Sequence, residues 1–466
     1  MSADALRALI GPLAPLGDAA WAVGGGVRDV LSGRPVADLD VAIAGDAKEA
    51  AAALCRAHGA TRFRLSRAFG AWRVQGGDLP FQVDITPLQG PDLAEDLGRR
   101  DLTINALAVP AAGGALIDPY GGLADLGART LRLVRPTALS DDPVRLLRLA
   151  RIGEQLGFRV DAGTRARARA DAARLWDAPG ERIADELARL VRLSRPDRAF
   201  ARLDDLGALG ALAPELEESR GLEQSPYHHK DVLGHILEVV EHAALVSADP
   251  EPVFRSRADR VREVLAVPLA DELTSRDALM ITALLHDMAK PATHAVTAEG
   301  RVTFMGHDRL GAEMADALMR RLRTSTRLRD SVARGVRWHL PLGFMVHHTP
   351  LSLRQIDRYL RLTAPSEVEI IVLSVADRLA TRGPRTSESA IRRHLVLARE
   401  VMDAHFALVD RGPLAPLLPG DEIARALGRE AGPWLAPLID ALREGQVVGA
   451  LRTRDQALRF ARGWRG

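Results

Sequence analysis

The sequence predicts an α/β domain at the N-terminus followed by a chain that is almost entirely helical. Up to about residue 138, short apolar runs alternate with helical stretches, whereas helical periodicity dominates from Ser140 onward. The composition agrees with this prediction, because Ala, Leu and Arg dominate and only 4% of the 466 residues are aromatic. A chain of this length has room for about three or four domains.

We place the domain boundaries where this pattern changes. The α/β head covers residues 1–138, a helical neck and body covers 139–225, a further all-α domain covers 226–386, and a small helical tail covers 387–466. The polar stretch from Pro214 to Pro226 marks the middle boundary.

Composition also limits the class of protein. The formal net charge is only +2, so no overall basic field indicates nucleic acid. The single cysteine, Cys55, cannot form an internal disulfide, which suits a reducing compartment. No apolar run is long enough to span a bilayer, and we expect a cytoplasmic protein that does not associate with membranes.

The most informative stretch runs from Trp21 to Ile43. A short strand ends in three glycines and a helix follows at Val27, so backbone N–H groups can approach a phosphate there. Asp38 and Asp40 are two apart on the next strand, and their carboxylates therefore face the same side. Such paired carboxylates suit magnesium, which is often shared with substrate phosphates. The alternative is a glycine turn followed by an acidic loop.

Two further acidic or basic motifs lie in the predicted head. Asp84 alternates with apolar residues on the predicted strand Phe81–Ile85, as a carboxylate on one strand face would. An ordinary aspartate at a strand end is the alternative. The run Arg99–Ala106 reads RRDLTINA, for which the alternative is a solvated charged turn.

A predicted helix begins at Asp141-Asp142-Pro143 and carries arginines at every third position. Asp142 and Arg145 are expected to share one face of it, and Arg148 and Arg151 continue the spacing. A carboxylate beside a guanidinium offers acceptors and donors that can read the edge of a base. The alternative is an intrahelical ion pair worth roughly 0.2–0.5 kcal/mol.

Together these motifs identify a family. GGGVRD followed by DLDVAI closely resembles the head of class II tRNA nucleotidyltransferases and bacterial poly(A) polymerases, which are polymerase-beta-like nucleotidyltransferases. RRDLTINA resembles their RRDxTxNA motif, and Asp141–Arg145 resembles their EDxxR motif with Asp in place of the first Glu. The resemblance implies a polymerase-beta-like head with Mg²⁺ on Asp38 and Asp40. Asp84 then lies where the superfamily often supplies a third acidic metal ligand.

The same resemblance implies roles for the basic residues. Gly25 and Arg28 are expected to hold the nucleotide phosphates, with Arg100 beside the sugar and triphosphate. Asp142 and Arg145 are expected to select C or A without a nucleic-acid template. Arg148 and Arg151 lie behind that pair as further nucleotide-binding residues.

Histidines cluster between residues 228 and 294, which indicates a second site. His235 lies on one predicted helix, the pair His286-Asp287 ends an apolar helix, and Asp377 interrupts a third helix that is otherwise apolar. A charge inside an apolar helix is costly unless it is paired or bound to metal. The order His…His-Asp…Asp resembles the HD metal-dependent phosphohydrolase domain.

That resemblance implies a divalent metal of unknown identity on His235, His286, Asp287 and Asp377. It also implies a second, phosphohydrolase activity. His307 and His339 are candidates for completing a two-metal site.

We therefore expect a template-independent enzyme that adds C to the tRNA 3′ end from CTP, with ATP as a further candidate substrate. Family members that complete CCA carry a flexible loop between the third acidic strand and the RRDxTxNA motif. Here that link is short and contains Pro87, Gly90 and Pro91, which predicts a stiff turn. The short link thus resembles that of the CC-adding subset of the family. This resemblance implies that a separate A-adding enzyme acts next on the same tRNA.

Three alternatives stay open at this point. Two are enzymes, namely a full CCA-adding enzyme and a poly(A) polymerase. The third is an RNA-binding or nucleotide-sensing HD protein whose head only binds. Intact Asp38 and Asp40 argue against a head without catalytic activity.

Overall fold

The computed structural model describes residues 3–67, 69–412 and 414–465. Its contacts divide the chain into two compact units. The first runs to Leu190 and includes Ala199–Leu212, and the second comprises Val191–Arg198 and the chain from Ala213 onward. The predicted α/β head and helical remainder are confirmed, while our four domain boundaries stay predictions.

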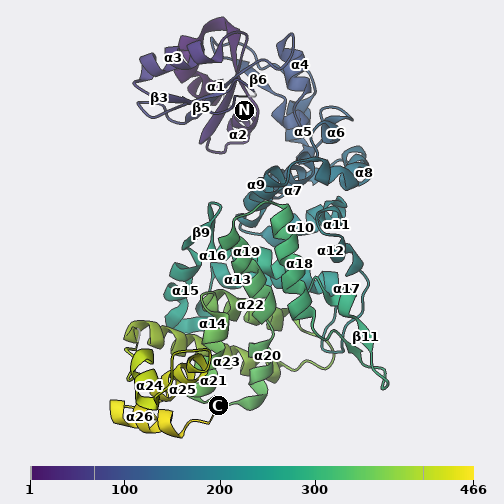
Figure 1. Ribbon diagram of the computed structural model, residues 1–466. Helices are drawn as coiled ribbons and strands as arrows, with labels where there is room; N and C mark the ends of the chain where they lie inside the picture. The colour runs from purple at the N-terminus through teal and green to yellow at the C-terminus, as the bar shows by residue number, and fades with distance from the viewer. Residues whose placement is uncertain (1–2, 68, 413, 466) are drawn as a thin grey trace. The chain divides into compact units, whose positions relative to one another are not determined.

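The head is built on one mixed six-stranded sheet with the strand order β3-β4-β5-β2-β1-β6 (Figure 1). Strands β2 and β5 are parallel, and the other neighbouring strands are antiparallel. The strands are β1 Ala20–Val23, β2 Asp38–Ile43, β3 Thr61–Arg64, β4 Trp72–Gln75, β5 Gln82–Pro87 and β6 Ala108–Pro110.

Helices surround this sheet and continue into the helical part of the first unit. They are α1 Ala3–Ile10, η1 Gly11–Ala19, α2 Gly25–Leu31, α3 Ala47–His58, α4 Leu93–Gly98, η2 Thr103–Asn105, α5 Gly122–Gly127, α6 Ala138–Asp141, α7 Arg145–Leu156, α8 Ala162–Asp171, η3 Ala172–Asp177, α9 Gly180–Val191, α10 Pro196–Asp205 and α11 Ala208–Leu212. A short parallel pair, β7 Thr130–Leu131 and β8 Arg159–Val160, lies among them.

Alternation along β2 separates the core from the predicted catalytic side. Leu39 and Val41 are buried in a cluster that includes Leu54 of α3, whereas Asp38 and Asp40 reach solvent on the other side of the strand. The predicted strand and the shared orientation of its two carboxylates are therefore confirmed. Strand β3 was not predicted, because its residues TRFR are mostly exposed and have no apolar alternation.

The predicted helix start at Asp141 is wrong in one respect. Asp142 has an extended backbone (φ −149°, ψ 94°) between α6 and α7, and α7 begins only at Arg145. Pro143 explains the break, since a proline disfavours the helical conformation of the residue before it. Asp142 and Arg145 therefore do not share a helical face.

The second unit is helical apart from two short hairpins. Its elements are α12 Pro214–Glu218, α13 Val232–Ala248, α14 Glu251–Phe254, η4 Arg255–Arg257, α15 Ala258–Leu265, β9 Pro268–Ala270, β10 Leu273–Thr274, α16 Ser275–Leu285, α17 Lys290–Thr293, β11 Ala295–Val296, β12 Val302–Thr303, α18 His307–Arg321, α19 Thr326–Trp338, α20 Pro341–Met345, η5 Val346–His348, α21 Leu353–Thr363, α22 Glu367–Ala380, α23 Glu388–Arg411, α24 Gly420–Leu427, α25 Leu435–Val447 and α26 Arg454–Gly463. Among the described residues, no helix combines the length and apolar character needed to cross a membrane.

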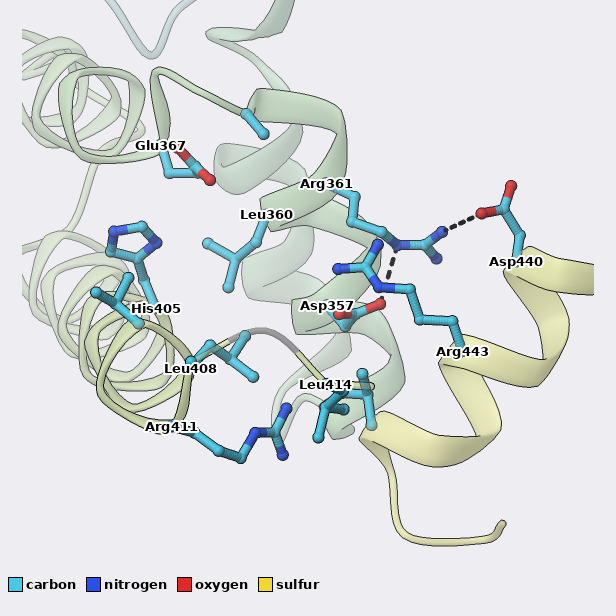
Figure 2. Close-up of a pocket in the computed structure, with 14 residues that line it drawn as sticks. Asp357, Leu360, Arg361, Glu367, His405, Leu408, Arg411, Leu414, Asp440 and Arg443 are labelled. Atoms are coloured by element: carbon cyan, nitrogen blue, oxygen red, sulfur yellow. Dashed lines mark hydrogen bonds and ion pairs between the residues drawn. The ribbon is translucent and has the colours of Figure 1, made fainter. Parts of the chain in front are cut away.

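Ion pairs between α21 and α25 help to attach the tail to the rest of this unit. Arg361 on α21 pairs with Asp357 one turn earlier (2.9 Å) and reaches Asp440 on α25 (3.5 Å) (Figure 2). These residues lie along a cavity of about 660 Å³ that contains none of the predicted site residues. The ion pairs thus serve to fix α25 against α21.

The turn before β5 yields a prediction about the stability of the head. Gly76 and Gly77 both have positive φ, but only at Gly77 would a Cβ collide with a backbone atom, the carbonyl oxygen of His58 at 1.9 Å. A left-handed residue other than glycine costs about 1–2 kcal/mol on its own. We expect Gly77→Ala to lower the melting temperature of the head clearly more than the matched Gly76→Ala. Equal shifts in a thermal melt would contradict this account.

Candidate functional site

A cavity of about 540 Å³ lies in the first unit between the glycine turn and the arginines of α7. Its lining is polar and carries many guanidinium groups. It consists of Gly24, Gly25, Arg28, Asp40, Gln89, Asp96, Arg99, Arg100, Asp101, Asn105, Arg145, Arg148, Arg151, Ile152 and Arg189.

Strand pairing places the carboxylates of the head. Asp40 on β2 lies directly opposite Asp84 on the parallel strand β5, and Asp38 lies two residues earlier on the same face. Asp40 reaches solvent through the cavity, but protein surrounds the rest of its carboxylate and this burial raises its pKa. Among the described residues it has no hydrogen-bond or ion-pair partner. The carboxylates of Asp38 and Asp40 in this arrangement fit a divalent cation that prefers oxygen ligands.

The glycine turn has to approach two charged groups closely. Gly24 has φ +75°, and a Cβ there would lie 2.7 Å from Nη1 of Arg100 and 3.1 Å from Oδ2 of Asp40. Any side chain at this position would fill the space between the turn and both groups. The turn therefore leaves backbone N–H groups, a carboxylate and a guanidinium facing one space.

A hydrogen-bonded chain runs from the turn to helix α7. Nη1 of Arg28 donates to Oδ1 of Asn105 (2.7 Å), and Nδ2 of Asn105 donates to Oδ1 of Asp101 (2.9 Å). Arg148 reaches Oδ2 of Asp101 at 3.4 Å. Although burial alone would raise the pKa of Asp101, Arg148 and the bond from Asn105 hold it below its ordinary value. Asp101 is therefore an ionised anchor.

Hydrogen bonds and ion pairs from neighbouring residues fix the predicted base-reading pair, Asp142 and Arg145. The guanidinium of Arg145 donates to the carbonyls of Arg99 (2.7 Å) and Ala138 (3.0 Å), and its Nε lies 3.8 Å from Oδ2 of Asp142. Arg182 donates to the same Oδ2 at 2.8 Å. Oδ1 of Asp142 and Nε of Arg145 are buried without a hydrogen-bond partner. One acceptor and one donor are thus buried in this structure with no hydrogen bond.

The last predicted arginine of α7 is anchored on helix α9. Arg151 pairs with the buried carboxylate of Glu186 and donates to Oε1 of Gln155 at 2.9 Å. Arg189, one turn after Glu186, reaches the same carboxylate at 3.5 Å with 55% of its side chain exposed. Glu186 therefore fixes two of the arginines that line the cavity.

The cavity brings together most of the residues predicted for nucleotide binding. Gly25, Arg28, Asp40, Arg100, Arg145, Arg148 and Arg151 line it, whereas Asp38, Asp84 and Asp142 do not. Sequence reasoning missed Asp101 and Asn105, although both stand in the RRDxTxNA motif that it singled out. It also missed Arg189, which no motif marks.

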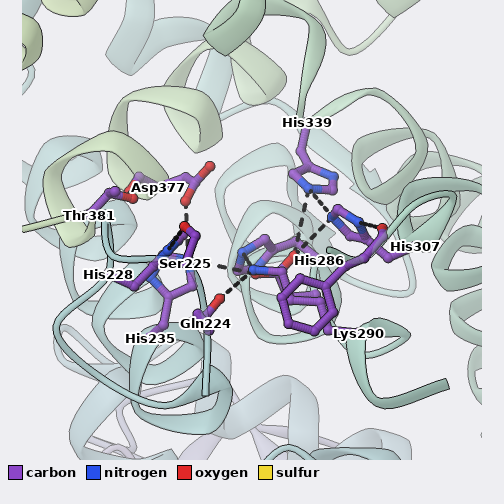
Figure 3. Close-up of polar contacts among 12 residues, drawn as sticks. Gln224, Ser225, His228, His235, His286, Lys290, His307, His339, Asp377 and Thr381 are labelled. Atoms are coloured by element: carbon purple, nitrogen blue, oxygen red, sulfur yellow. Dashed lines mark hydrogen bonds and ion pairs between the residues drawn. The ribbon is translucent and has the colours of Figure 1, made fainter. Parts of the chain in front are cut away.

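Four histidines of the second unit lie around the carboxylate of Asp287. Figure 3 labels these histidines, which are His235, His286, His307 and His339. Oδ2 of Asp287 lies 3.1 Å from Nε2 of His286 and 3.6 Å from Nε2 of His235. Oδ1 of the same carboxylate lies 3.2 Å from Nε2 of His307 and 3.8 Å from Nε2 of His339. The geometry thus contains two candidate ligand groups that share Asp287.

The backbone fixes which ring nitrogen of three histidines faces the carboxylate. Nδ1 of His286, His307 and His339 lies 2.8, 2.6 and 2.6 Å from a backbone carbonyl oxygen three residues earlier. Because a carbonyl only accepts, Nδ1 carries the hydrogen and Nε2 presents a lone pair in the neutral ring. Lone pairs converging on a buried carboxylate, with Nε2 of His307 and His339 only 3.4 Å apart, fit a metal centre.

Electrostatics distinguishes the rings of this cluster: burial alone would lower the pKa of His286, but the charge of Asp287 raises it above its ordinary value. Burial, followed by the charge of His286, lowers the pKa of His339 to about 4, so its ring is neutral near pH 7. Burial alone would raise the pKa of Asp287, but His286 and Lys290 hold it well below its ordinary value. Asp377 on α22 lies 3.1 Å from Nε2 of His235. All four predicted residues and both further histidines are thus in one place.

Lys290 was not predicted to belong to this centre. Its Nζ lies 2.6 Å from Oδ2 of Asp287 and 2.6 Å from Oε1 of Gln224. The spacing of three residues from Asp287 was the available signal, since it places both side chains on one side of a helical turn. Gln224 comes from a distant loop and has no such signal.

Comparison with known proteins matches three segments of the chain to family models. Residues 20–132 match the family described as Poly A polymerase head domain, residues 157–219 match the probable RNA and SrmB-binding site of polymerase A, and residues 232–382 match the HD domain. An A-adding tRNA nucleotidyltransferase of Deinococcus radiodurans is 34% identical over 97% of each chain. The chain belongs to the CCA-adding tRNA nucleotidyltransferase family. It is a nucleotidyltransferase.

Other relatives of this nucleotidyltransferase carry different names. A CC-adding tRNA nucleotidyltransferase of Thermus thermophilus is 34% identical over 96% of this chain and 94% of the relative. A CCA-adding enzyme in complex with ATP has the same fold, with a TM-score of 0.67 at 18% identity over 98% of this chain and 95% of that one. A Thermotoga maritima CCA-adding enzyme complexed with tRNA gives 0.61 at 19% identity, over 99% and 95%.

The shared position of Asp287 yields a prediction for the nucleotidyltransferase. The variant Asp287→Ala removes the carboxylate common to both ligand groups, so we expect both to lose metal. The affinity should fall by more than the roughly 10- to 100-fold that loss of an outer partner costs. Metal content after dialysis, measured by plasma mass spectrometry, checks this.

His394→Ala is a matched control, because His394 is 2% exposed in the same unit and bonds Ser374 instead of the cluster. It should keep its metal even if it melts earlier. Full metal content in Asp287→Ala would contradict a centre built on this carboxylate.

Proposed function

We propose that this nucleotidyltransferase adds cytidines to the 3′ end of tRNA from CTP. The observation that carries the proposal is the single cavity in which the glycine turn and Asp40 face the arginines of α7. Such a cavity suits a ligand with a triphosphate at one end and a base at the other. The relative named for CC addition to tRNA supports these substrates, and the relative named for A addition supports tRNA.

Residues at the glycine turn hold the triphosphate. Backbone N–H groups from Gly25 onward, at the start of α2, favour anionic oxygens, whereas the N–H of Gly24 donates to the carbonyl of Leu107 (3.3 Å). Arg28 and Arg100 add fixed cations, of which Arg28 is already oriented by Asp29 and Asn105. Asp38 and Asp40 hold Mg²⁺, which supplies charge stabilisation for phosphate and for the attacking oxygen when bound.

Base selection follows from the two unpartnered atoms at Asp142 and Arg145. Oδ1 of Asp142 accepts from the exocyclic amino group that C and A both have, and Nε of Arg145 donates to a ring acceptor. U and G present a carbonyl at the corresponding edge, which Asp142 repels. Arg182 and the carbonyls behind Arg145 keep this pair oriented, so the protein replaces the template.

The link after β5 supports termination after two cytidines. It spans only Leu88–Asp92, and the backbone N–H groups of its first two residues are hydrogen-bonded. Leu88 N–H donates to the carbonyl of Ile43 (2.9 Å), and Gln89 N–H donates to Oδ1 of Asp96 (2.9 Å). A segment held in this way has little freedom to reposition the base-reading residues for A. A separate A-adding enzyme would then complete the end.

A second candidate function is A addition alone. It is favoured by the Deinococcus radiodurans relative, which matches as well as the CC-adding one in percentage identity. Oδ1 of Asp142 and Nε of Arg145 suit the Watson–Crick edge of adenine as well as that of cytosine. A full CCA-adding enzyme and a poly(A) polymerase are the remaining enzymes that the experiment below separates.

We further propose that the HD cluster is a metal-dependent phosphohydrolase that works independently of the head. The two ligand groups that share Asp287 would hold two divalent cations, which would supply charge stabilisation for a phosphoester when bound. Lys290 beside Asp287 supplies a cation for the phosphate.

The substrate test uses tRNAs that lack three, two or one of the terminal nucleotides, each with CTP, ATP or both. We expect extension by two nucleotides on the first substrate with CTP and no further growth with ATP. Asp38→Ala and Asp40→Ala should each reduce the rate by orders of magnitude. Extension only of the tRNA that ends in CC would establish A addition, and extension by three would establish full CCA synthesis.

Base reading by Arg145 has its own test. In Arg145→Ala the preference for CTP over UTP, as a ratio of kcat/KM values, should fall by about 5- to 150-fold, equivalent to roughly 1–3 kcal/mol. Arg174→Ala is the matched control, because this exposed arginine pairs with Asp177 and does not line the cavity. A full CTP preference in Arg145→Ala would place base reading elsewhere.

A further inference from the structure

A row of three charged residues crosses the head sheet beside the catalytic carboxylates. Arg73 on β4 lies directly opposite Asp84 on β5, and Asp84 lies directly opposite Asp40 on β2. Residues that face each other on neighbouring strands point to the same side of a sheet. Asp84 is therefore placed between a cation and a predicted metal ligand.

Arg73 donates hydrogen bonds to both carboxylate oxygens of Asp84. Nε of Arg73 donates to Oδ1 and Nη2 donates to Oδ2, each at 2.7 Å. Two parallel bonds of this kind are the strong, geometrically specific form of an ion pair. The side chains are only 27% and 15% exposed, so solvent screens the pair weakly.

The same guanidinium also affects the next carboxylate. Its Nη2 lies 4.0 Å from Oδ1 of Asp38. Three carboxylates, Asp38, Asp40 and Asp84, would otherwise repel one another on this face. A fixed positive charge at Asp84 relieves that repulsion and at the same time opposes the approach of a divalent cation to Asp84.

We infer that Asp84 anchors Arg73 and does not ligate the metal of the head. Arg73 is then a positioning residue, which holds a permanent cation beside Asp38 and leaves Asp38 and Asp40 as the two carboxylates for Mg²⁺. This replaces the expectation that Asp84 is a third metal ligand. It rests on the proposed role of Asp38 and Asp40 in nucleotide addition.

The test measures Mn²⁺ binding to the full-length protein by electron paramagnetic resonance of free Mn²⁺. The part of the isotherm that Asp40→Asn loses identifies the head site. In Asp84→Asn we expect that part to weaken by no more than about tenfold, the lower end of what an outer partner costs. An Asp84→Asn isotherm that matches Asp40→Asn would make Asp84 a ligand and overturn the inference.

The variant Arg73→Met provides a second test, in which the Mn²⁺ affinity of the head should rise instead of fall. Loss of the guanidinium frees Asp84 to act as a carboxylate ligand, so Mn²⁺ should bind the head more tightly than in the wild type. The double variant Arg73→Met/Asp84→Asn should return towards wild-type affinity, because the gain needs the freed carboxylate. A gain of equal size in the double variant would overturn the inference.

Arg64→Met is the matched control, since Arg64 lies on the neighbouring strand β3 against Trp72 and pairs with no carboxylate among the described residues. It removes the same charge and should leave Mn²⁺ affinity unchanged. Melting of the metal-free protein gives an independent readout, in which Arg73→Met and Asp84→Asn should each lower the transition and the double variant should add little.

Failure of this inference can be told apart from failure of the proposed function. If the wild type adds nucleotides but Asp84→Asn loses the head Mn²⁺, only the role of Asp84 is wrong. If no tRNA substrate is extended while the Mn²⁺ pattern holds, the proposed addition is wrong and the Arg73–Asp84 pair stands.

Discussion

The buried carboxylate of Asp101 is the contact on which the arrangement of the head cavity depends. It accepts from the Asn105 side chain and from its neighbour's backbone N–H, and it faces Arg148 of α7. Asn105 in turn orients Arg28 at the glycine turn. A buried charge is tolerated only when it is paired and hydrogen-bonded. The glycine turn and helix α7, at opposite sides of the cavity, are thus joined through one ionised carboxylate.

Asp287 has the corresponding position in the HD cluster. It is fully surrounded by imidazoles and by Lys290, and its two oxygens divide the histidines into two groups. Backbone carbonyls in or shortly before helices α16, α18 and α19 fix the rings of His286, His307 and His339. The helices therefore position the ligands through main-chain contacts, which side-chain substitutions elsewhere leave intact.

Both sites combine residues inside regular elements, such as Asp40 on β2 and His235 on α13, with residues at points where regular structure is interrupted. Asp40 is beside the glycine turn between β1 and α2, Asp142 lies at the break before Pro143, and His286 follows the last residue of α16. At such points backbone groups and short side chains are free of the hydrogen bonds of a helix or sheet. They are consequently available to bind a ligand while the adjacent element stays rigid.

The sequence by itself determined the α/β head, the helical remainder, the facing carboxylates of β2 and the order of the HD residues, because each depends on local periodicity or spacing. It misplaced Asp142, where Pro143 overrides the helical pattern. Only the tertiary structure decided that Arg73 occupies Asp84, that Asp101 joins Arg28 to Arg148, and that Gln224 reaches Lys290. These contacts join residues that are distant in the chain, and no local spacing encodes which of many charged side chains will meet.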